Sequence, residues 1–178
     1  MTCTAECSCS PAVSPDGKKI AYVAKNIDGN EYVWVMNADG TGNTQFYEGR
    51  EPAWTPDGQK IVFVSRRAGK SEIWLMDRDG LNLSRLTIST AGEEYMQPSA
   101  SSDGKRIAFT SNRNGNWDIW IMNLDGSGMR QLTNHLGEDI NPTWAPDGKA
   151  ILYSSTRNAE DLNLWLDYLP SEIVDQGK

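Results

Sequence analysis

The chain has 178 residues, of which 38% are hydrophobic and 23% are charged. This composition is typical of a globular domain with a substantial core, and it excludes a disordered chain. The formal net charge of −7 at pH 7 disfavours binding to duplex nucleic acid, which selects basic surfaces. No apolar run approaches the ~20 residues that a membrane-spanning helix needs.

The first ten residues form a segment of their own, which contains all three cysteines. Cys3, Cys7 and Cys9 do not form a four-ligand zinc motif, because the one histidine of the chain, His135, is distant in sequence. A disulfide from Cys3 to Cys7 or Cys9 is the pairing that such a terminal segment would allow. The segment lacks the basic start and the apolar centre of a signal peptide. As written, the sequence therefore predicts a cytoplasmic protein, unless the chain is processed from a longer precursor.

From Pro11 onward, the same pattern occurs four times. One marker is an Asp-Gly pair, which begins at Asp16, Asp57, Asp103 and Asp147. Successive pairs are 41, 46 and 44 residues apart. A second marker recurs at nearly the same intervals of 40, 46 and 45 residues: Trp34, Trp74, Trp120 and Trp165, each of which lies between apolar residues. Periods in the low forties are typical of four-stranded propeller blades or of helical repeats.

The content of each unit favours strands. In the second unit, the runs 60–65 and 72–77 are rich in β-branched and aromatic residues. Glycine-containing turns separate such runs and leave no room for two helices. A short first strand at 52–54 and a fourth strand at 84–88 would complete an antiparallel blade, and 130–134 is the matching fourth strand of the third unit. We expect the repeated tryptophan to pack between blades.

The sequence thus predicts one all-β domain, a β-propeller of four four-stranded blades. The blades span approximately 11–51, 52–97, 98–141 and 142–178, and Glu172 to Asp175 is the candidate for the last strand. Residues 1–10 could complete a blade instead. Four blades could close as a tight ring, or two copies could join into an eight-bladed ring. The apolar faces of the two terminal blades favour this homodimer.

The repeated unit can be written as P-x-W-[ST]-P-D-G-x-K-I-x-[FY]-x-S, followed by [IV]-W-x-M-[ND]-x-D-G and R-x-L-T. It resembles the WD-like repeat of the TolB family of β-propellers. The resemblance implies a propeller, and for a TolB protein it implies six blades, a periplasmic location and binding of the lipoprotein Pal through one face. This chain has four repeats, and Ala100 and Ser102 replace the tryptophan and the turn proline of the third unit.

The sequence contains few of the residue patterns that catalysis requires, and we assign no catalytic residue. The chain has no G-x-S-x-G motif, and His135 alone cannot supply the several histidines of a metal lyase. We therefore expect a non-catalytic binding or scaffold propeller that presents one loop face to a protein or small ligand. The alternative is a propeller fragment or gate of an enzyme, since the same repeat occurs in prolyl-oligopeptidase-type peptidases and in oligogalacturonate lyases.

Acidic residues concentrate in the connections that lead from each fourth strand to the next unit. In a propeller these connections gather on one face near the axis, so their side chains would form a negatively charged rim. Such a rim could bind a partner or hold Ca²⁺, and no other cofactor is expected. The candidate rim residues are Glu48, Glu51, Glu93, Glu94, His135, Glu138 and Asp139.

A basic series recurs in the loops between the second and third strands. Its members are Lys25, Arg67, Arg113 and Arg157. We expect these loops on the face opposite the acidic rim, with Glu72 and Asp118 as ion-pair partners across the hairpins. Exposed pairs of this kind contribute only ~0–1 kcal/mol.

Overall fold

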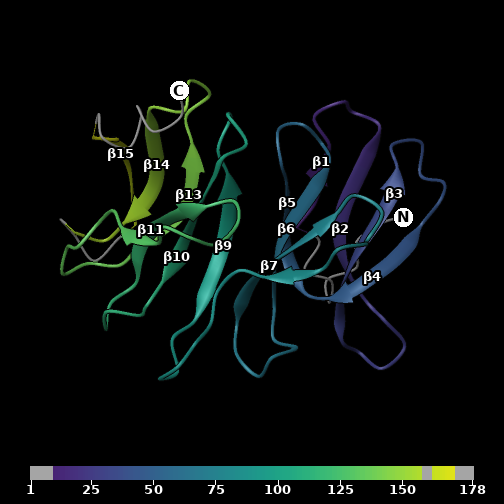
Figure 1. The fold of residues 1–178 in the computed structure, drawn as a ribbon, viewed down its shortest axis with the longest axis horizontal. Helices are drawn as coiled ribbons and strands as arrows, with labels where there is room; N and C mark the ends of the chain where they lie inside the picture. The colour runs from purple at the N-terminus through teal and green to yellow at the C-terminus, as the bar shows by residue number, and fades with distance from the viewer. Residues whose placement is uncertain (1–9, 158–161, 171–178) are drawn as a thin grey trace.

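The strands that the structure describes form four separate antiparallel sheets (Figure 1). The computed structural model of the protein describes residues 10–157 and 162–170, and that part of the chain contains no helix. Each sheet is a meander in which strands consecutive in sequence are hydrogen-bonded neighbours. The all-β, blade-type fold predicted from the repeat is therefore confirmed. In the same residues, no helix has the length and hydropathy that a membrane crossing requires.

Each sheet corresponds to one repeat of the sequence. Blade 1 contains β1 (Ala12–Val13), β2 (Lys19–Lys25), β3 (Glu31–Asn37) and β4 (Thr44–Glu48). Blade 2 contains β5 (Arg50–Trp54), β6 (Lys60–Ser65), β7 (Glu72–Asp77) and β8 (Ser84–Arg85). Blade 3 contains β9 (Tyr95–Ala100), β10 (Arg106–Ser111), β11 (Asp118–Asn123) and β12 (Arg130–Gln131). Blade 4 contains β13 (Asp139–Trp144), β14 (Ala150–Ser155) and β15 (Asn163–Tyr168).

Some predicted boundaries differ from those observed. The first strand of blade 2 begins at Arg50, before the proline that was expected to open it, and β13 likewise begins at Asp139. The fourth strands are shorter than predicted, because β8 and β12 span only Ser84–Arg85 and Arg130–Gln131. The predicted last strand at 172–175 and the three cysteines lie outside the described residues.

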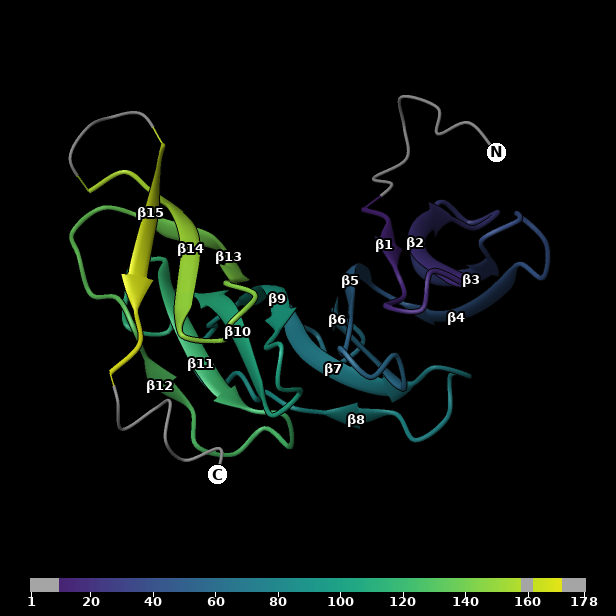
Figure 2. The same ribbon diagram turned by 90° about the horizontal axis from the view of Figure 1, so that it is seen from above.

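The four blades are arranged as an arc around an axis (Figure 2). Their first strands lie along the inside of the arc, where β1 packs on β5, β5 on β9 and β9 on β13. In the part of the chain that the structure describes, β13–β15 pack against blade 3 and not against blade 1. Figure 2 shows the two ends of the arc apart. The described strands therefore do not close into a four-bladed ring.

The core consists of three apolar clusters, one between each pair of neighbouring blades. We call the side of a blade that packs on the next blade its forward face, which in blade 1 includes Val33 and Val35. The side that packs on the preceding blade is its backward face, which in blade 2 includes Trp54, Ile61 and Phe63. The same arrangement recurs between blades 2 and 3 and between blades 3 and 4.

The repeated tryptophans of the third strands contact these clusters as predicted. Trp120 is buried between blades 2 and 3, and Trp74 and Trp165 pack against the clusters before and after it. Trp34 has no preceding blade in the described structure and stacks on Tyr22 of its own blade, with 6.5 Å between ring centroids.

The Asp-Gly repeats form the turns between the first and second strands. In blade 2, the Thr55 hydroxyl donates to Asp57 Oδ1 at 2.6 Å, and the backbone N–H of Gln59 donates to the same oxygen at 3.0 Å. These hydrogen bonds, the hydroxyl's first, lower the pKa of Asp57. Asp16 and Ser14 repeat the arrangement in blade 1. The repeated aspartates are turn formers.

Replacing Gly58 with valine is expected to lower the free energy of unfolding by about 1 kcal/mol or more. Gly58 has a φ of 65°, and Gly148 has 68° in the equivalent turn. A β-branched side chain resists this left-handed conformation. Urea denaturation would measure the loss. Gly58→Asn is the matched control, because asparagine tolerates left-handed φ, and an equal loss in both variants would contradict the turn argument.

Candidate functional site: the connection face and its grooves

The hairpin loops and the blade-to-blade connections share one face of the arc. Arg66, in the loop between β6 and β7, approaches Glu94 of the connection between β8 and β9, with 3.6 Å from Nη2 to Oε1. The prediction of opposite faces is therefore wrong, because every second connection of an antiparallel meander returns to the same end of the sheet. We call this side the connection face; it comprises residues 26–30, 66–71 and 112–117 of the loops and 49, 86–94 and 132–138 of the connections.

A groove of about 410 Å³ follows the inside of the arc. Residues of β5, β9 and β13 and the two residues before β1 line it, and the same position of each repeat contributes a polar residue directly before a proline. These residues are Ser10, Glu51, Gln97 and Asn141. The last three have left-handed φ values of 54°, 54° and 56° although none is glycine. The pairing of β5, β9 and β13 with their second strands shifts register near these residues. Such bulges change the direction in which side chains point.

The polar residues of this groove link one blade to the next. The backbone N–H of Gln97 donates to Glu51 Oε2 at 2.6 Å, and the backbone N–H of Asn141 donates to Gln97 Oε1 at 3.0 Å. Thr110 also donates its hydroxyl to Gln97 Oε1 at 2.7 Å. Each side chain thus fixes the backbone of the following blade, and the series ends at Asn141, which is exposed. Backbone strain of this kind is concentrated at functional sites in many proteins.

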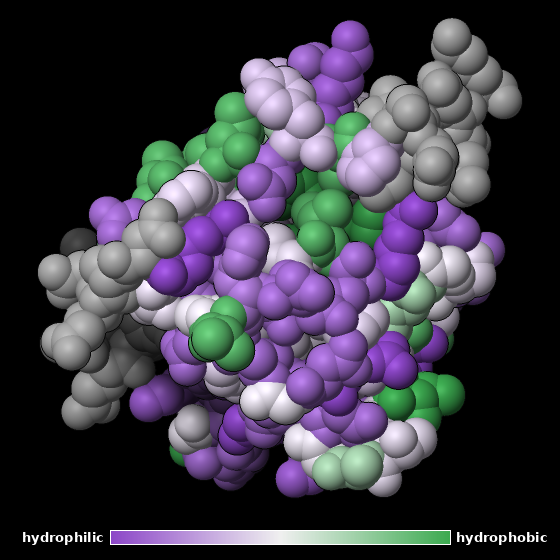
Figure 3. Space-filling view, turned by 90° about the vertical axis from the view of Figure 1, so that its left-hand side faces the viewer, coloured by the Kyte–Doolittle hydropathy of each residue, from purple (hydrophilic) through white to green (hydrophobic). Residues whose placement is uncertain are grey.

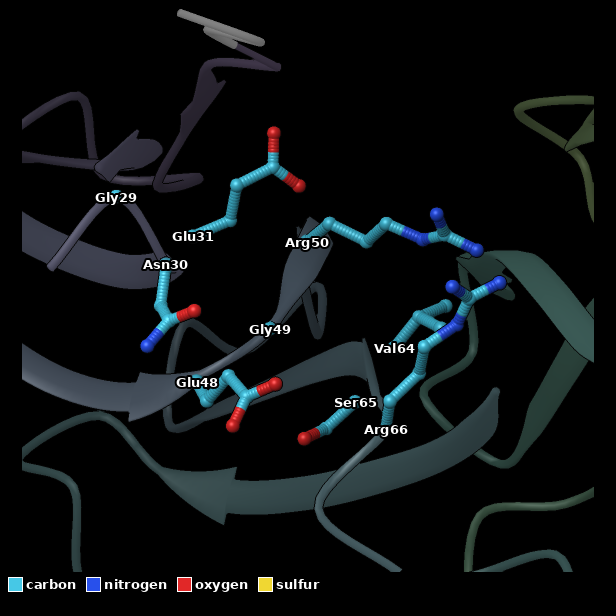
Figure 4. Close-up of a pocket in the computed structure, with 9 residues that line it drawn as sticks. All are labelled: Gly29, Asn30, Glu31, Glu48, Gly49, Arg50, Val64, Ser65 and Arg66. Carbon is cyan, nitrogen blue, oxygen red and sulfur yellow. The ribbon is translucent and has the colours of Figure 1, made fainter. Parts of the chain in front are cut away.

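A second groove, of about 200 Å³, opens on the connection face between blades 1 and 2. Its charged residues are Glu31, Glu48, Arg50 and Arg66 (Figure 4). The two guanidinium groups extend away from the two carboxylates in Figure 4. Arg50 Nη2 and Arg66 Nε both donate to Ser71 Oγ, at 3.2 and 3.0 Å. The groove therefore has one acidic and one basic side, an arrangement that suits a ligand with both charges, such as a peptide segment.

The structure places the four predicted acidic residues of the first two connections in four different environments. Glu48 lines the charged groove, and Glu51 lines the axial groove. Glu93 stabilises its own loop, since its carboxylate accepts hydrogen bonds from the backbone N–H groups of Ala91 and Thr90 at 2.7 and 2.8 Å. These hydrogen bonds, the one from Ala91 first, lower the pKa of Glu93 to about 2. Glu94 forms the ion pair with Arg66.

The predicted residues of the third connection do not form a common site. His135 and Glu138 are exposed, whereas Asp139 is 0% exposed and has no access to a partner. Within residues 10–157 and 162–170, no group of three or more His, Cys, Asp or Glu side chains is placed to hold a metal ion. Binding of a partner at the rim stays a prediction.

Asp139 lies beside a second buried carboxyl group. Asp118, which is 2% exposed, accepts hydrogen bonds from Gln131 Nε2 at 2.9 Å and from the Thr133 hydroxyl at 3.3 Å. Burial raises the pKa of Asp118, and the charge of Asp139 raises it further. Neither carboxylate oxygen of Asp139 accepts a hydrogen bond from any described residue. Two buried acidic groups thus share the contact between blades 3 and 4.

In the described residues, the expected ion pairs of Arg67 with Glu72 and of Arg113 with Asp118 are not formed. Arg157 does pair within its hairpin, with 3.8 Å from Nη2 to Asp167 Oδ2. The guanidinium groups of Arg67, Arg113 and Arg157 stack on the third-strand tryptophans, at 5.2, 5.0 and 4.2 Å from the centroids of Trp74, Trp120 and Trp165. The tryptophan lies beside the loop, and an aromatic face attracts a cation. Lys25 is exposed at the end of β2.

Glu72, the expected partner of Arg67, binds residues of its own blade instead. Its carboxylate pairs with Arg85 Nη2 at 2.6 Å, and it also accepts hydrogen bonds from the Thr87 hydroxyl and from the backbone N–H of Ser89.

Sequence reasoning found Glu51 but missed Gln97 and Asn141, the other members of the axial series. The signal that could have identified them is their position directly before the first proline of each repeat. It also missed Arg50 and Arg66, because no repeat pattern brings residues of blades 1 and 2 together at the charged groove.

The chain is similar in fold to several propellers of known structure. A TolB-type protein from Agrobacterium tumefaciens is 25% identical, with a TM-score of 0.82 over 92% of this chain and 62% of its own length. TolB from Acinetobacter baumannii is 24% identical, with a TM-score of 0.75 over 89% and 40%. An oligogalacturonate lyase in complex with manganese is 14% identical, with a TM-score of 0.63 over 98% and 69%. The chain therefore spans less than two thirds of each TolB structure.

The family comparison covers most of the sequence. No curated protein matches the chain, but the family model described as the TolB beta propeller domain matches residues 2–162. That range includes the axial series, the charged groove and the first three blades in full. The chain belongs to the TolB β-propeller domain family.

Proposed function

We propose that the chain is a non-catalytic binding module that holds a segment of a protein partner on its connection face. The observation that carries the proposal is the charged groove between blades 1 and 2. Its acidic side, with Glu31 and Glu48, and its basic side, with Arg50 and Arg66, would bind complementary charges of an extended peptide. Loops on a rigid scaffold are a common place for such recognition.

Two further observations support a binding role. The Arg50 side chain is 30% exposed; its Nε lies 3.9 Å from Glu51 Oε1 and its Nη2 donates to Ser71 Oγ, so a bound carboxylate would contact the exposed part of a guanidinium group that these residues hold in place. Family membership makes the partner of TolB, the lipoprotein Pal, the first candidate. It also favours the periplasm over the cytoplasm that the sequence as written predicts.

The second candidate is the platform or gate of an enzyme. The observation that favours it is the fold shared with the oligogalacturonate lyase, which contains manganese. Thermal denaturation with and without Mn²⁺ or Ca²⁺ would distinguish the two candidates. A metal that binds the folded state raises the melting temperature in proportion to the logarithm of its concentration above Kd, and a purely protein-binding module would show no such rise.

We expect Arg66→Glu to weaken binding of Pal by about tenfold or more, which corresponds to about 1.4 kcal/mol. The substitution would remove a hydrogen-bond donor from the basic side of the groove and place a negative charge beside the negative charge of Glu94. Isothermal titration calorimetry of the purified chain with purified Pal would measure the change. Lys18→Glu is the matched control, because it makes the same charge change on an exposed turn at the opposite face. Equal losses in both variants, or no binding by the unmodified chain, would rule out this site for Pal.

A further inference from the structure

The contact between blades 1 and 2 contains a pocket at the face opposite the connection face. On the side of the molecule at the blade 4 end of the arc, hydrophobic groups lie among hydrophilic ones on the surface (Figure 3). Between blades 1 and 2, in contrast, a pocket of about 380 Å³ reaches the apolar cluster that joins the two blades. We call it the turn pocket; the residues that matter for its chemistry are Lys19, Val35, Phe46 and Arg78. Pockets of this size hold small molecules in many proteins.

The apolar wall of the turn pocket is held in place by blade 2. Val35 belongs to the cluster between the blades, and Phe46 packs against it. A Cβ atom at Gly80 would lie 2.9 Å from Phe46 Cδ1, so the phenyl ring packs directly on the backbone of the turn between β7 and β8. The Tyr47 hydroxyl donates to the carbonyl oxygen of Gly80 at 3.0 Å and joins the same two elements. Phe46 is only half-buried, so part of its ring can contact a ligand.

The first residue of β2 brings a cation without an acidic partner to the pocket. Lys19 Nζ donates to the neutral amide of Asn37, at 3.1 Å from Oδ1. The same two positions of blade 2 hold Lys60 and Asp77, which form an ion pair of 2.5 Å. Among the described residues, Lys19 forms no ion pair. Blade 1 therefore has an uncompensated ammonium group where blade 2 has a neutralised one.

A second cation enters the turn pocket from blade 2. Arg78 lies in the turn between β7 and β8, is half-buried, and forms no ion pair with a described residue. The equivalent position of blade 3 is Leu124, which packs against the core between blades 2 and 3. A guanidinium group thus lines the pocket at a position where the next blade uses an apolar side chain to extend its core.

Two acidic groups lie near Arg78 without pairing with it. Asp79 is exposed, and its Oδ1 accepts a hydrogen bond from the backbone N–H of Leu81 at 3.0 Å. Asp16 is also exposed; the hydrogen bond from the Ser14 hydroxyl is the first cause of its lowered pKa, and the charge of Arg78 is a lesser one. The guanidinium group of Arg78 therefore retains hydrogen-bond donors for a ligand.

We propose that the turn pocket binds a small organic carboxylate, with the carboxylate near Lys19 and Arg78 and an apolar body against Phe46 and Val35. Ammonium and guanidinium groups form strong, charge-assisted hydrogen bonds with a carboxylate. The apolar body would remove the exposed part of the phenyl ring from water. The turn pocket and the charged groove lie on opposite faces, so this binding is independent of the partner binding proposed above.

An NMR titration of the isotope-labelled chain with phenylacetate tests the proposal. The backbone amide signals of Val35, Phe46 and Arg78 should shift together, with a Kd on the order of 1 mM. Phenylacetamide has the ring without the charge, and acetate has the charge without the ring; each should bind about tenfold more weakly. Equal binding of phenylacetamide would exclude a role for the two cations, and equal binding of acetate would exclude the apolar wall. Either result, or no shift of these amides with phenylacetate, would overturn the proposal.

Two variants of the cations locate the binding. Arg78→Leu should abolish the shifts, because it removes one cation and introduces the residue type that blade 3 has at this position. Lys19→Met should weaken binding of phenylacetate by about fivefold or more. Lys18→Met is the matched control, since it removes the same charge from the exposed neighbour of Lys19. Circular dichroism would confirm that the variants remain folded. Equal losses in Lys18→Met and Lys19→Met would reduce the effect to general charge attraction and overturn the assignment of the site.

Discussion

Replacing Glu72 with alanine is expected to lower the free energy of unfolding by about 3 kcal/mol. Glu72 is 0% exposed, and its carboxylate accepts hydrogen bonds from Arg85, Thr87 and Ser89. Alanine would leave the buried Thr87 hydroxyl without this acceptor, together with the partly buried Arg85 guanidinium and Ser89 N–H. A buried polar group that is left without a partner destabilises the folded state by more than the net stabilisation that its hydrogen bond contributed.

Urea denaturation followed by tryptophan fluorescence would measure this loss. Glu31→Ala is the matched control, because Glu31 begins β3 as Glu72 begins β7 but is partly exposed at the charged groove. Its replacement should change the free energy of unfolding by less than about 0.5 kcal/mol. If the two variants lost the same amount, the network around Glu72 would not be a stabilising element of blade 2.

Much of the blade could be predicted because the repeated residues act locally. The hydroxyl of Thr55, the carboxylate of Asp57 and the left-handed backbone of Gly58 determine one turn, and they are five or fewer residues apart. Apolar residues occupy both sides of β6 and β7, which indicates strands that are buried between two neighbouring blades. These features need no knowledge of the neighbouring blade, so four copies in the sequence were enough to indicate four sheets.

The site could be predicted less well because it depends on contacts between blades. The stacking of Arg67 on Trp74 and the burial of Glu72 depend on which way a loop folds over the edge of its hairpin. The start of the first strand mattered as well. Because β13 begins at Asp139 and not at the proline, a residue predicted to lie in an exposed connection is the first residue of a strand, and its side chain is buried.

Replacing Asp139 with asparagine is expected to lower the pKa of Asp118 and to increase the free energy of unfolding at pH 7 by about 1 kcal/mol or more. Burial is the first cause of the raised pKa of Asp118, and the charge of Asp139 adds to it. The folded protein therefore holds this proton more tightly than the unfolded chain, in which the carboxyl has its ordinary value near 3.8. The stability that comes from Asp118 is present below pH 4 and is lost as the pH rises through the raised pKa.

Two measurements would test this expectation on the same variant. An NMR titration of the Asp118 carboxyl carbon should show a lower pKa in Asp139→Asn, and urea denaturation should show a gain that is larger at pH 7 than at pH 4. Asp147→Asn is the control, because it removes an equal charge from an exposed turn of the same blade. If Asp139→Asn destabilised the protein at pH 7 and left the pKa of Asp118 unchanged, the two carboxyl groups would not oppose each other. A stabilising partner of Asp139 would then have to lie outside residues 10–157 and 162–170.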